Sequence, residues 1–564
     1  PIRNTMYGLD FSYKSELPSV TRLLNRLPFY STKAMSSINA YGEGAFLKPG
    51  HPPQIGSGDQ GLIFIDDFEG TRTNIDLRFP FVAWTLASTP QGNPRFPEAT
   101  LIDSIDYNFN RAKLAWYNIE PNLQDKNSSN NPLRRNVAEL SDPRVRQVFT
   151  NELFPQRTTN ITDVQTATLD LAYYPKEKGP YNFETRSTQI GADGKFKTPT
   201  AKWGGIMRAI DQTDFETGNI EYFEIWMQDP FITSPNSRGG KIVLNLGNIS
   251  EDILKDGKRF YENGMNTPKV PAQVDSSNTW GKTPVNPIQI TQAFSNDPAD
   301  RPYQDVGFDG LDDNAEKVKK NYILQKLANN FGTSSLVYQK ALTDPAGDNY
   351  KWYRDNSFDA AGTGILGRYK NHNNPQGNSP IANTGAFTPA ATLFPDNEDL
   401  NRDNTLNETE AYYEYEVALK PGMAVGVTPY ITDKRTLSVN AADGTVKSEN
   451  WFLFRIPIRG YTRKVGNMSD FKSIRFARLY LTDFEDSVVV RMARMDLVRN
   501  QWRQFNFKLD TTGSYLPIPV NSGVTFNTLA VNLEENSSRQ PVNYLMPPGV
   551  ERVQLLSNNG VNLQ

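Results

Sequence analysis

Residues 220–248, IEYFEIWMQDPFITSPNSRGGKIVLNLGN, decide the fold, because two runs of alternating apolar residues here flank a turn-rich linker. Successive side chains of an extended strand point to opposite faces, so every second residue shares a face. The residues that share an apolar face are Phe223, Ile225 and Met227 in the first run, and Ile242, Leu244 and Leu246 in the second. A period of two predicts two half-buried β-strands.

The same period recurs along the chain. In WFLFRIPI, residues 451–458, the shared face carries Phe452, Phe454, Ile456 and Ile458. Further strand candidates are GLIFIDDFEG, FPFVAWTLAS, LDLAYY, YYEYEVAL, SIRFARLYL and SVVVRMARMDLV. The sequence therefore predicts a mainly β protein, and the strand order resembles a galactose-binding-type jelly-roll β-sandwich of the kind found in carbohydrate-binding modules. This likeness concerns the fold and carries no sugar specificity.

Five regions follow from this pattern. An extended segment at 1–60 includes the alternating MYGLDFSYK, a barrel-adjacent or edge strand. The two halves of the sandwich, 61–249 and 411–500, are separated by a loop-rich insertion at 250–410, and 501–564 is predicted to be an extended C-terminal linker. The insertion contains one predicted helix, AEKVKKNYILQKLANNFG, with a C-terminal cap at Gly332 and an apolar stripe of Val318, Tyr322, Ile323, Leu327 and Phe331.

Composition narrows the classes of function. The chain of 564 residues has 60 basic and 63 acidic residues, a balance that argues against nucleic acid as a main partner. It has no cysteine, which excludes disulfides, thiolate zinc sites and cysteine nucleophiles. The sequence contains no run of 18 apolar residues, so it predicts no transmembrane helix. The start at Pro1, without a leader of the signal-peptide type, suggests a fragment or a processed product.

Enzymatic motifs are weak, and we expect no catalytic site. The two histidines, His51 and His372, lie in Pro-, Gly- and Asn-rich stretches that predict loops. The G-x-G-x-x-G match at 56–61 precedes a strand, whereas a dinucleotide site needs a strand before it and a helix after it. Asp66 and Asp67 invite comparison with paired glycosidase carboxylates, but adjacent strand residues point to opposite faces.

Residues 399–410, DLNRDNTLNETE, match the spacing of a twelve-residue calcium loop. Thr405 is predicted to bind through its backbone carbonyl. The other predicted ligands bind through their side chains and are Asp399, Asn401, Asp403, Asn407 and Glu410. The loop departs from the pattern at Asn404, where glycine is expected, although asparagine tolerates the left-handed conformation better than most residues. A solvated acidic loop without metal is the alternative.

Residues 305–316, DVGFDGLDDNAE, form a second candidate calcium loop. The predicted ligands are Asp305, Asp309, the Leu311 carbonyl, Asp313 and Glu316. The glycine required at position six is present as Gly310, while the ligand at position three is replaced by Gly307.

Two further groups have a structural and a functional interpretation. One group consists of carboxylates near the ends of the expected sandwich strands, Asp66, Asp67, Glu69 and Asp496. We favour a structural role for them, as caps and salt-bridge partners, over a third metal site. Tyr222 and Trp226 share the strand face opposite Phe223, where they either fill a second core layer or form an exposed sugar or protein platform. Burial is favoured.

Long strings in fixed order carry a family resemblance. They are YGLDFSYKSELPSVTRLLNRLPFYSTKAMSSINAYGEGAFLKPGHP, FIDDFEGTRTNIDLRFPFVAWTLASTPQGNPRFPE, WGGIMRAIDQTDFETGNIEYFEIWMQDPF, QDVGFDGLDDNAE, FPDNEDLNRDNTLNETEAYYEYEV, FLFRIPIRGYTRKVGNMSDFKSIRFARLYLTDFE and YLMPPGVER. Their ordered set resembles the SprA/Sov family, the outer-membrane translocon proteins of the Bacteroidetes type 9 secretion system that also serve gliding motility.

The resemblance implies an internal segment of a giant single-chain outer-membrane β-barrel through which folded cargo with a C-terminal signal passes. It implies a PorV-like barrel protein and a periplasmic plug protein as partners. The strand signals are too irregularly spaced for a barrel wall, so most of the segment is expected to form the extracellular cap, with a structural or gating role. A carbohydrate-binding or adhesive cell-surface module is the alternative.

Overall fold

The computed structural model describes residues 5–29, 31–48, 74–155, 164–285, 293–380 and 394–499, together with the backbone of 507–508 and 516–517. The chain divides into two compact units, one of Pro1–Thr71 with Val542–Gln564 and one of Arg72–Pro541. Within the described ranges, no helix combines the length and the apolar character needed to cross a membrane.

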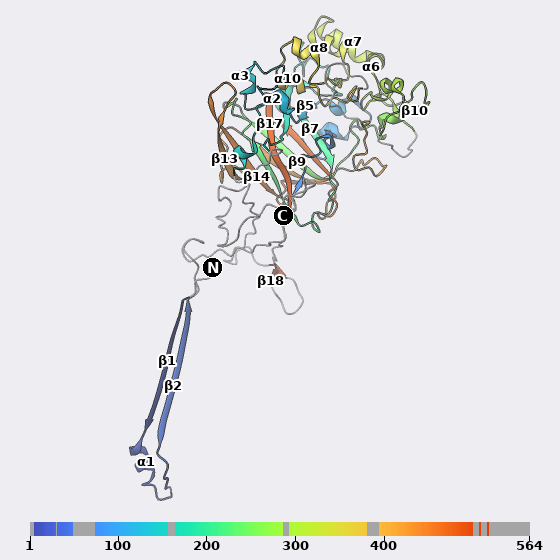
Figure 1. Ribbon diagram of the computed structural model, residues 1–564. Coiled ribbons are helices and arrows are strands. Elements are labelled where there is room, and N and C mark those ends of the chain that lie inside the picture. The colour runs from blue at the N-terminus through green and yellow to red at the C-terminus, as the bar shows by residue number, and fades with distance from the viewer. Residues whose placement is uncertain are drawn as a thin grey trace. The chain divides into compact units, whose positions relative to one another are not determined.

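The first unit contains a long antiparallel hairpin (Figure 1). Its strands are β1 (Thr5–Glu16) and β2 (Ser37–Lys48), which pair over their full length, and the short helix α1 (Pro18–Leu24) lies in the connection between them. The alternation in β1 predicted a barrel-adjacent or edge strand, and the structure pairs this strand with β2. The alternation of β2, SINAYGEGAFLK, is weakened by its small residues, Gly42 and Gly44 among them.

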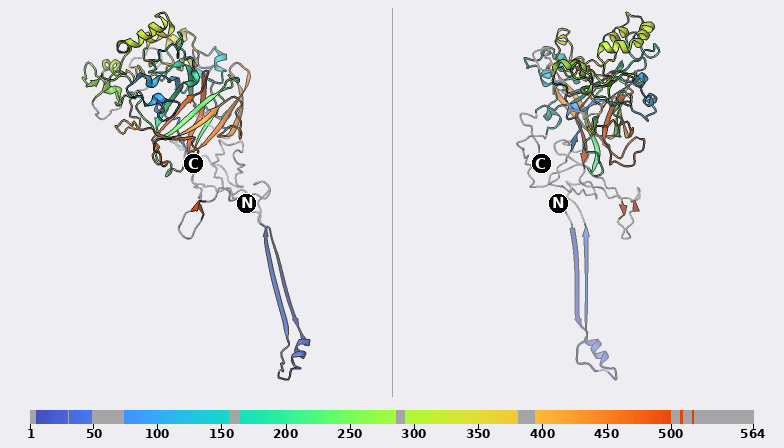
Figure 2. Two further views of the ribbon diagram at one scale, coloured as in Figure 1. Left: turned by 180° about the vertical axis from the view of Figure 1, so that it is seen from behind. Right: turned by 90° about the vertical axis from the view of Figure 1, so that its right-hand side faces the viewer.

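The second unit is built on two antiparallel sheets, so the mainly β prediction is confirmed (Figure 2). The six-stranded sheet has the order β15 (Arg463–Val465), β12 (Ala411–Leu419), β9 (Gly240–Asn248), β16 (Phe476–Thr482), β7 (Trp203–Ala209) and β4 (Thr85–Leu86). The seven-stranded sheet has the order β13 (Ile431–Asn440), β14 (Val446–Pro457), β8 (Ile220–Gln228), β17 (Val488–Arg499), β6 (Leu169–Lys178) and β5 (Ala112–Tyr117), with β3 (Ile75–Asp76) also paired to β17.

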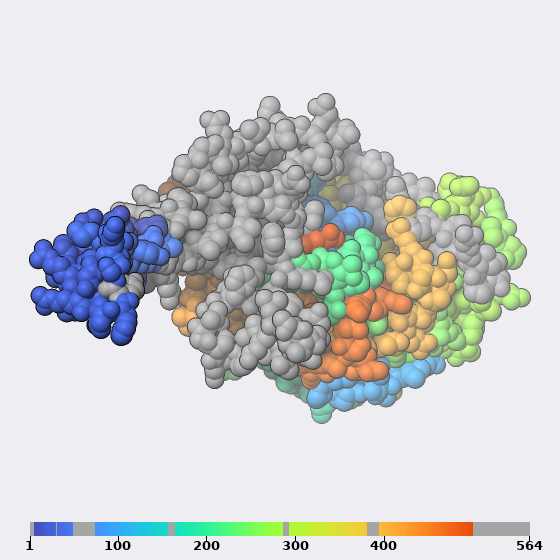
Figure 3. Space-filling view, turned by 90° about the horizontal axis from the view of Figure 1, so that it is seen from below, coloured from blue at the N-terminus to red at the C-terminus, as the bar shows by residue number. Residues whose placement is uncertain are grey.

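In both sheets, strands that precede the insertion pair with strands that follow it. In one sheet β16 lies between β9 and β7, and in the other β8 lies between β14 and β17. Segments far apart in the sequence therefore lie side by side, as the adjacent blue and orange-red surfaces of Figure 3 show. The predicted contribution of the GLIFIDDFEG strand falls outside the described residues. The jelly-roll assignment and the five region boundaries stay predictions.

One apolar core lies between the two sheets. It contains the alternating faces predicted from the sequence, including Ile225 and Phe454 of the seven-stranded sheet and Leu244 of the six-stranded sheet. At Gly204 of β7, an added Cβ would lie 3.0 Å from the Cβ of Leu114 in β5, so the sheets approach closely there. The WGGIMR string is thus a tightly packed strand.

The outer face of the seven-stranded sheet is also covered. Trp226 of β8 packs with Trp451 of β14 beneath Phe154, which follows the short helix α4 (Thr150–Leu153). Elsewhere on this sheet, residues of β5 and β6 pack against insertion residues near Tyr353 and Tyr369. The prediction that Trp226 is buried is confirmed, and Tyr222 is partly exposed.

The connections contain short helices and minor sheets. The other α-helices are α2 (Pro121–Gln124), α3 (Val137–Leu140), α5 (Arg301–Gln304), α6 (Asp313–Lys319), α7 (Asn321–Phe331), α8 (Leu336–Thr343), α9 (Asn356–Ala360) and α10 (Ile365–Tyr369). The 3-10 helices are η1 (Phe81–Ala83), η2 (Pro97–Thr100), η3 (Ile105–Asn108), η4 (Pro199–Ala201), η5 (Glu262–Gly264) and η6 (Pro298–Asp300). Two-residue strand pairs are β10 (Val274–Asp275) with β11 (Thr283–Pro284) and β18 (Phe507–Lys508) with β19 (Leu516–Pro517).

The single helix predicted near 315–332 is wrong in one respect, because the structure has two helices that meet at Lys320. The Lys320 side chain turns inward, where its ammonium donates to the carbonyls of Thr279 and Trp280 at 2.7 and 2.6 Å. Val318 and Tyr322 are exposed, so these two members of the predicted apolar stripe are wrong. The prediction that α7 ends at Gly332 is confirmed, and this residue has a φ of 82°.

The shared core predicts the effect of a truncation on β14. Phe454→Ala removes a fully buried ring, and we expect it to lower the free energy of unfolding by about 3–5 kcal/mol. Val446→Ala on the exposed start of the same strand is the matched control, with an expected change within about 0.5 kcal/mol. Urea unfolding followed by tryptophan fluorescence measures both, and equal midpoints for the two variants would contradict a common core.

Candidate functional site

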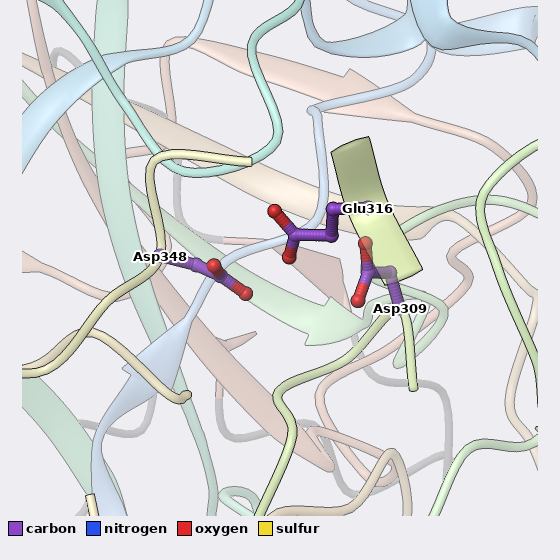
Figure 4. A group of neighbouring side chains, drawn as sticks. All are labelled: Asp309, Glu316 and Asp348. Atoms are coloured by element: carbon purple, nitrogen blue, oxygen red, sulfur yellow. The ribbon is translucent and has the colours of Figure 1, made fainter. Parts of the chain in front are cut away.

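Three carboxylates from separate parts of the insertion converge at one place. Asp309 lies in the loop before α6, Glu316 lies on α6, and Asp348 lies in the loop after α8. Their side chains point toward one another (Figure 4). One oxygen from each lies within 4.8 Å of an oxygen from each of the other two, and the residues are only 1%, 0% and 0% exposed.

Local backbone signals place these side chains. Gly310 adopts a φ of 66°, a left-handed conformation that favours glycine and turns the chain directly after Asp309. Asp312 then caps α6 by accepting a hydrogen bond from the Ala315 amide at 2.9 Å. This cap fixes where the helix begins and therefore the position of Glu316 one turn later.

Each of the three carboxylates has one oxygen engaged and one without a hydrogen-bond partner. Asp309 accepts from the Leu311 amide at 3.0 Å, Glu316 from the Ala346 amide at 3.0 Å, and Asp348 from the Tyr181 hydroxyl at 2.7 Å. The unpartnered oxygens are Asp309 Oδ2, Glu316 Oε1 and Asp348 Oδ1. Burying a charged oxygen without a partner is costly, so either a proton or a cation at these carboxylates would lower that cost.

Two more carboxylates border the cluster. Asp313 and Asp344 each place an oxygen within 4.8 Å of the other and of Glu316, which therefore belongs to both groups. Asp344 accepts from the amides of Gly347 and Asp348 at 2.8 and 3.1 Å, and Asp313 accepts from the Asn349 side chain. We call these five residues, Asp309, Asp313, Glu316, Asp344 and Asp348, the carboxylate cluster.

The electrostatics of the cluster favour neutralisation. Burial, followed by the charges of Asp348 and Asp309, raises the pKa of Glu316 to about 11. Burial also raises the pKa of Asp309 to about 7 and that of Asp348 well above its usual value. Among the described residues, none of the five carboxylates forms a salt bridge. The charge of Lys320 lowers the pKa of Asp309, while its ammonium donates to two carbonyls. Lys113 and Lys317 act in the same sense on Asp344 and Asp313.

The sequence identified three members of the cluster and missed two. The 305–316 loop predicted Asp309, Asp313 and Glu316, which the structure brings together, whereas Asp344 and Asp348 come from DPAGD, one short turn beyond α8. Leu311 donates its amide to Asp309. The chain supplied one signal for the missing pair, two aspartates four residues apart in a glycine-containing turn.

Asp305, the first residue of that loop, faces elsewhere. It accepts from the Ser379 amide at 3.0 Å and lies near Glu262 and Asp396, two further buried carboxylates. Burial raises the pKa of Asp305 to about 6 and that of Asp396 to about 7, and burial with the charges of both aspartates raises the pKa of Glu262. In the described part of the chain, these three do not bring their oxygens within 4.8 Å of one another.

The 399–410 loop is closed by hydrogen bonds. Asp399 accepts from the amides of Asp403 and Asn404, both at 3.0 Å, and Asn404 adopts the left-handed conformation with a φ of 64°. Asp403 accepts from the Asn401 side chain and from the Thr405 amide, at 2.9 Å each. The loop is thus closed by its own hydrogen bonds.

The last two predicted ligands of this loop make other contacts. Asn407 donates to the Ile249 carbonyl at 2.6 Å, and Glu410 pairs with Arg478 through contacts of 2.8 and 2.9 Å. Both side chains of that pair are almost fully buried. Calcium at this loop stays a prediction, and Glu410 would have to exchange Arg478 for the ion to complete the predicted ligand set.

The other candidates have structural partners. Asp496 accepts from the Asn74 side chain at 3.1 Å and lies 3.4 Å from Arg494 Nε, the capping and salt-bridge arrangement favoured above. His372 packs among Tyr350, Tyr353 and Tyr369, and burial lowers its pKa to about 4. The candidates His51, Asp66, Asp67, Glu69 and the 56–61 glycine motif lie outside the described residues.

The fold and the cluster define a mainly β protein whose loop-rich insertion carries a buried acidic centre. A family model, SprA_N, described as motility related/secretion protein, matches residues 321–564. Residues 321–564, less than half of the chain, are thus similar to a family of motility-related and secretion proteins. No curated protein matches it.

The Asp305 group predicts a pH dependence of stability. A carboxyl whose pKa is higher in the folded chain than in the unfolded chain holds more protons when folded, so stability falls as the pH rises through that interval. Asp305→Asn removes the charge, and we expect it to raise the urea midpoint at pH 7.5 while changing it little at pH 4.5.

The exposed Asp106, replaced by asparagine, serves as the control for this measurement. The native protein and the two variants are unfolded in urea at pH 4.5 and pH 7.5. Chelator is present throughout, so that bound cations do not contribute to stability. A stabilisation by Asp305→Asn that is equal at both pH values would contradict the raised pKa.

Proposed function

We propose that the chain is a structural, non-enzymatic segment of the outer-membrane translocon of the type 9 secretion system, needed for protein export and gliding motility. The family match supports a motility- and secretion-related role. The finer assignment, to the membrane-embedded translocon, rests on one observation, the amphipathic character of the β1–β2 hairpin.

One face of the hairpin is almost wholly apolar. Directly paired residues of antiparallel strands share a face, and the pairs Tyr7–Phe46 and Tyr13–Ala40 bracket Leu9 and Phe11, which face Gly44 and Gly42. Leu9 and Phe11 are 75% and 57% exposed. This row of large apolar side chains continues from one strand end nearly to the other.

The opposite face is polar over most of its length. It carries the pairs Asp10–Glu43, Ser12–Tyr41 and Lys14–Asn39, and becomes apolar only at Met6–Leu47 near the open end. A strand that crosses a bilayer needs about 9–11 residues, with apolar side chains toward lipid and polar ones toward the lumen. Both strands have 12 residues, so lipid is the environment that suits this hairpin.

The sandwich suits the role of a cap in this proposal. Outer-membrane barrels carry their long loops on the extracellular side, and a jelly-roll sandwich with a large insertion is the kind of element that such a loop would form. The proposed partners are a PorV-like barrel protein, a periplasmic plug protein and cargo with a C-terminal signal. They rest on the family resemblance alone.

The carbohydrate-binding alternative is not favoured. It depended on an exposed aromatic platform at Tyr222 and Trp226, and the Trp226 ring lies buried in an edge contact with Phe154. Tyr222, whose own ring lies under Arg455, does not complete a two-ring platform.

The hairpin predicts how the protein responds to a charge in mid-strand. Phe11→Arg places a cation on the apolar face, and a cation facing lipid near the bilayer midplane costs about 2–4 kcal/mol. We expect less of the protein in the outer-membrane fraction, less secreted protein in the culture medium, and reduced colony spreading when this variant replaces the native gene.

Ser12→Arg is the matched control, because it adds the same charge one residue away on the polar face. We expect this variant to retain both membrane assembly and secretion. Equal assembly of the two variants would show that lipid does not contact the apolar face. Normal assembly of Phe11→Arg with lost secretion would contradict the membrane argument while leaving the family role intact.

A further inference from the structure

From their convergence and their unpartnered oxygens, we infer that Asp309, Glu316 and Asp348 bind one calcium ion, which locks the insertion in its folded form. The inference goes beyond the proposed secretion role and does not depend on it. The site differs from a continuous twelve-residue calcium loop, because Asp348 comes from the turn after α8. Asp344, at the border of the cluster, comes from the same turn.

The geometry fits an ion of this size. Calcium is bound by oxygens at about 2.3–2.6 Å, so two oxygens that share one ion are separated by at most about 5 Å. One oxygen from each of the three residues lies within 4.8 Å of the others. The three side chains point toward one another, and each has a buried oxygen without a hydrogen-bond partner that is available to an ion.

The unpartnered oxygens supply evidence independent of the acidic composition. Many acidic clusters are stabilised by arginine, lysine or backbone amides, as Glu410 is by Arg478. In this cluster one oxygen of each carboxylate is held by an amide or a hydroxyl, while the other is buried without a donor. Three converging carboxylates that each keep one buried oxygen without a donor match the demand of a cation.

Calcium suits the site better than magnesium. Magnesium keeps several of its waters and requires a smaller, regular octahedron, whereas calcium accepts six to eight oxygen ligands in irregular arrangements. The three central residues are at most 1% exposed, which leaves little access for a hydrated ion. Asp313 and Asp344, next to Glu316, supply further oxygens at the border of the site.

The site holds together three segments of the second unit. Tyr181, in the loop after β6, donates its hydroxyl to Asp348 and accepts from the Phe308 amide at 2.8 Å, next to Asp309. Its own amide donates to the Ala346 carbonyl at 2.7 Å. An ion between α6 and the turn after α8 therefore also fixes these segments to the loop that leaves the seven-stranded sheet.

The test is a calcium titration of the full chain after removal of metal by chelator. Isothermal titration calorimetry compares the native protein with Asp309→Asn/Glu316→Gln, which keeps the size and the engaged oxygens of both side chains. We expect the native protein to bind one more calcium ion than the double variant. Asp106→Asn, at an exposed aspartate, is the control for the stoichiometry, and Asp403→Asn, in the 399–410 loop, is the control for the cleavage measurement below.

Trypsin cleavage reports the locking effect, because Lys317 and Lys319 lie on α6. At a calcium concentration about 100 times the dissociation constant, binding suppresses local opening by about 100-fold. We expect calcium to slow cleavage on α6 at least about tenfold in the native protein and in Asp403→Asn, and to have no effect in the double variant.

A second measurement does not depend on the folding of any variant. Terbium, which occupies calcium sites, should luminesce in the native protein on excitation of nearby aromatic residues such as Tyr181, and calcium should displace it. Equal calcium stoichiometry for the native protein and the folded double variant overturns the inference. If the double variant does not fold, absence of calcium-displaceable terbium luminescence together with calcium-independent cleavage on α6 overturns it.

Discussion

The pairing of strands that are distant in sequence is the constraint on which the second unit depends. β8 is paired on one side with β14 and on the other with β17, and β9 is similarly enclosed by β12 and β16. Neither sheet can form from the first half of the chain alone, and the core between the sheets requires both. The buried pair of Arg478 on β16 and Glu410, just before β12, adds a charged contact between two of the late segments.

This pairing also positions the insertion. Asn248, the last residue of β9, is paired directly with Ala411, the first residue of β12, so the insertion leaves and re-enters the sheet at neighbouring positions. The insertion is not a free loop, because residues near Tyr353 and Tyr369 cover the outer face of the seven-stranded sheet. Its buried carboxylates are thus held in place by a scaffold that the sheets have already fixed.

Much of the sheet structure could be predicted from periodicity, and the exceptions have physical reasons. Phe223 and Phe454 lie on the predicted core face because every second residue of a strand shares a face. The helix was predicted as continuous because 315–332 has helical spacing throughout, but the buried ammonium of Lys320 takes its partners from Thr279 and Trp280, which no local pattern reveals. β2 was missed because its small residues conceal the alternation.

The candidate site, too, could be predicted from the sequence only in part. Asp309 and Glu316 follow from the spacing of one loop, whereas Asp348 reaches them through tertiary structure, by way of α8 and its following turn. Asp305 has the right spacing and lies with Glu262 and Asp396 instead. Loop spacing predicts which residues are available as ligands, and the packing of separate segments decides which of them meet.

The interleaved strand order has a consequence for biosynthesis. The strands from β3 to β9 are made first, and those that complete their sheets, β12 to β17, follow only after the whole insertion has been synthesised. Until then the early strands present apolar faces and unpaired backbone edges, which are the features that make a nascent chain aggregate. The protein therefore has a long vulnerable interval during its production, and a holding chaperone that shields residues 203–248 would act during that interval.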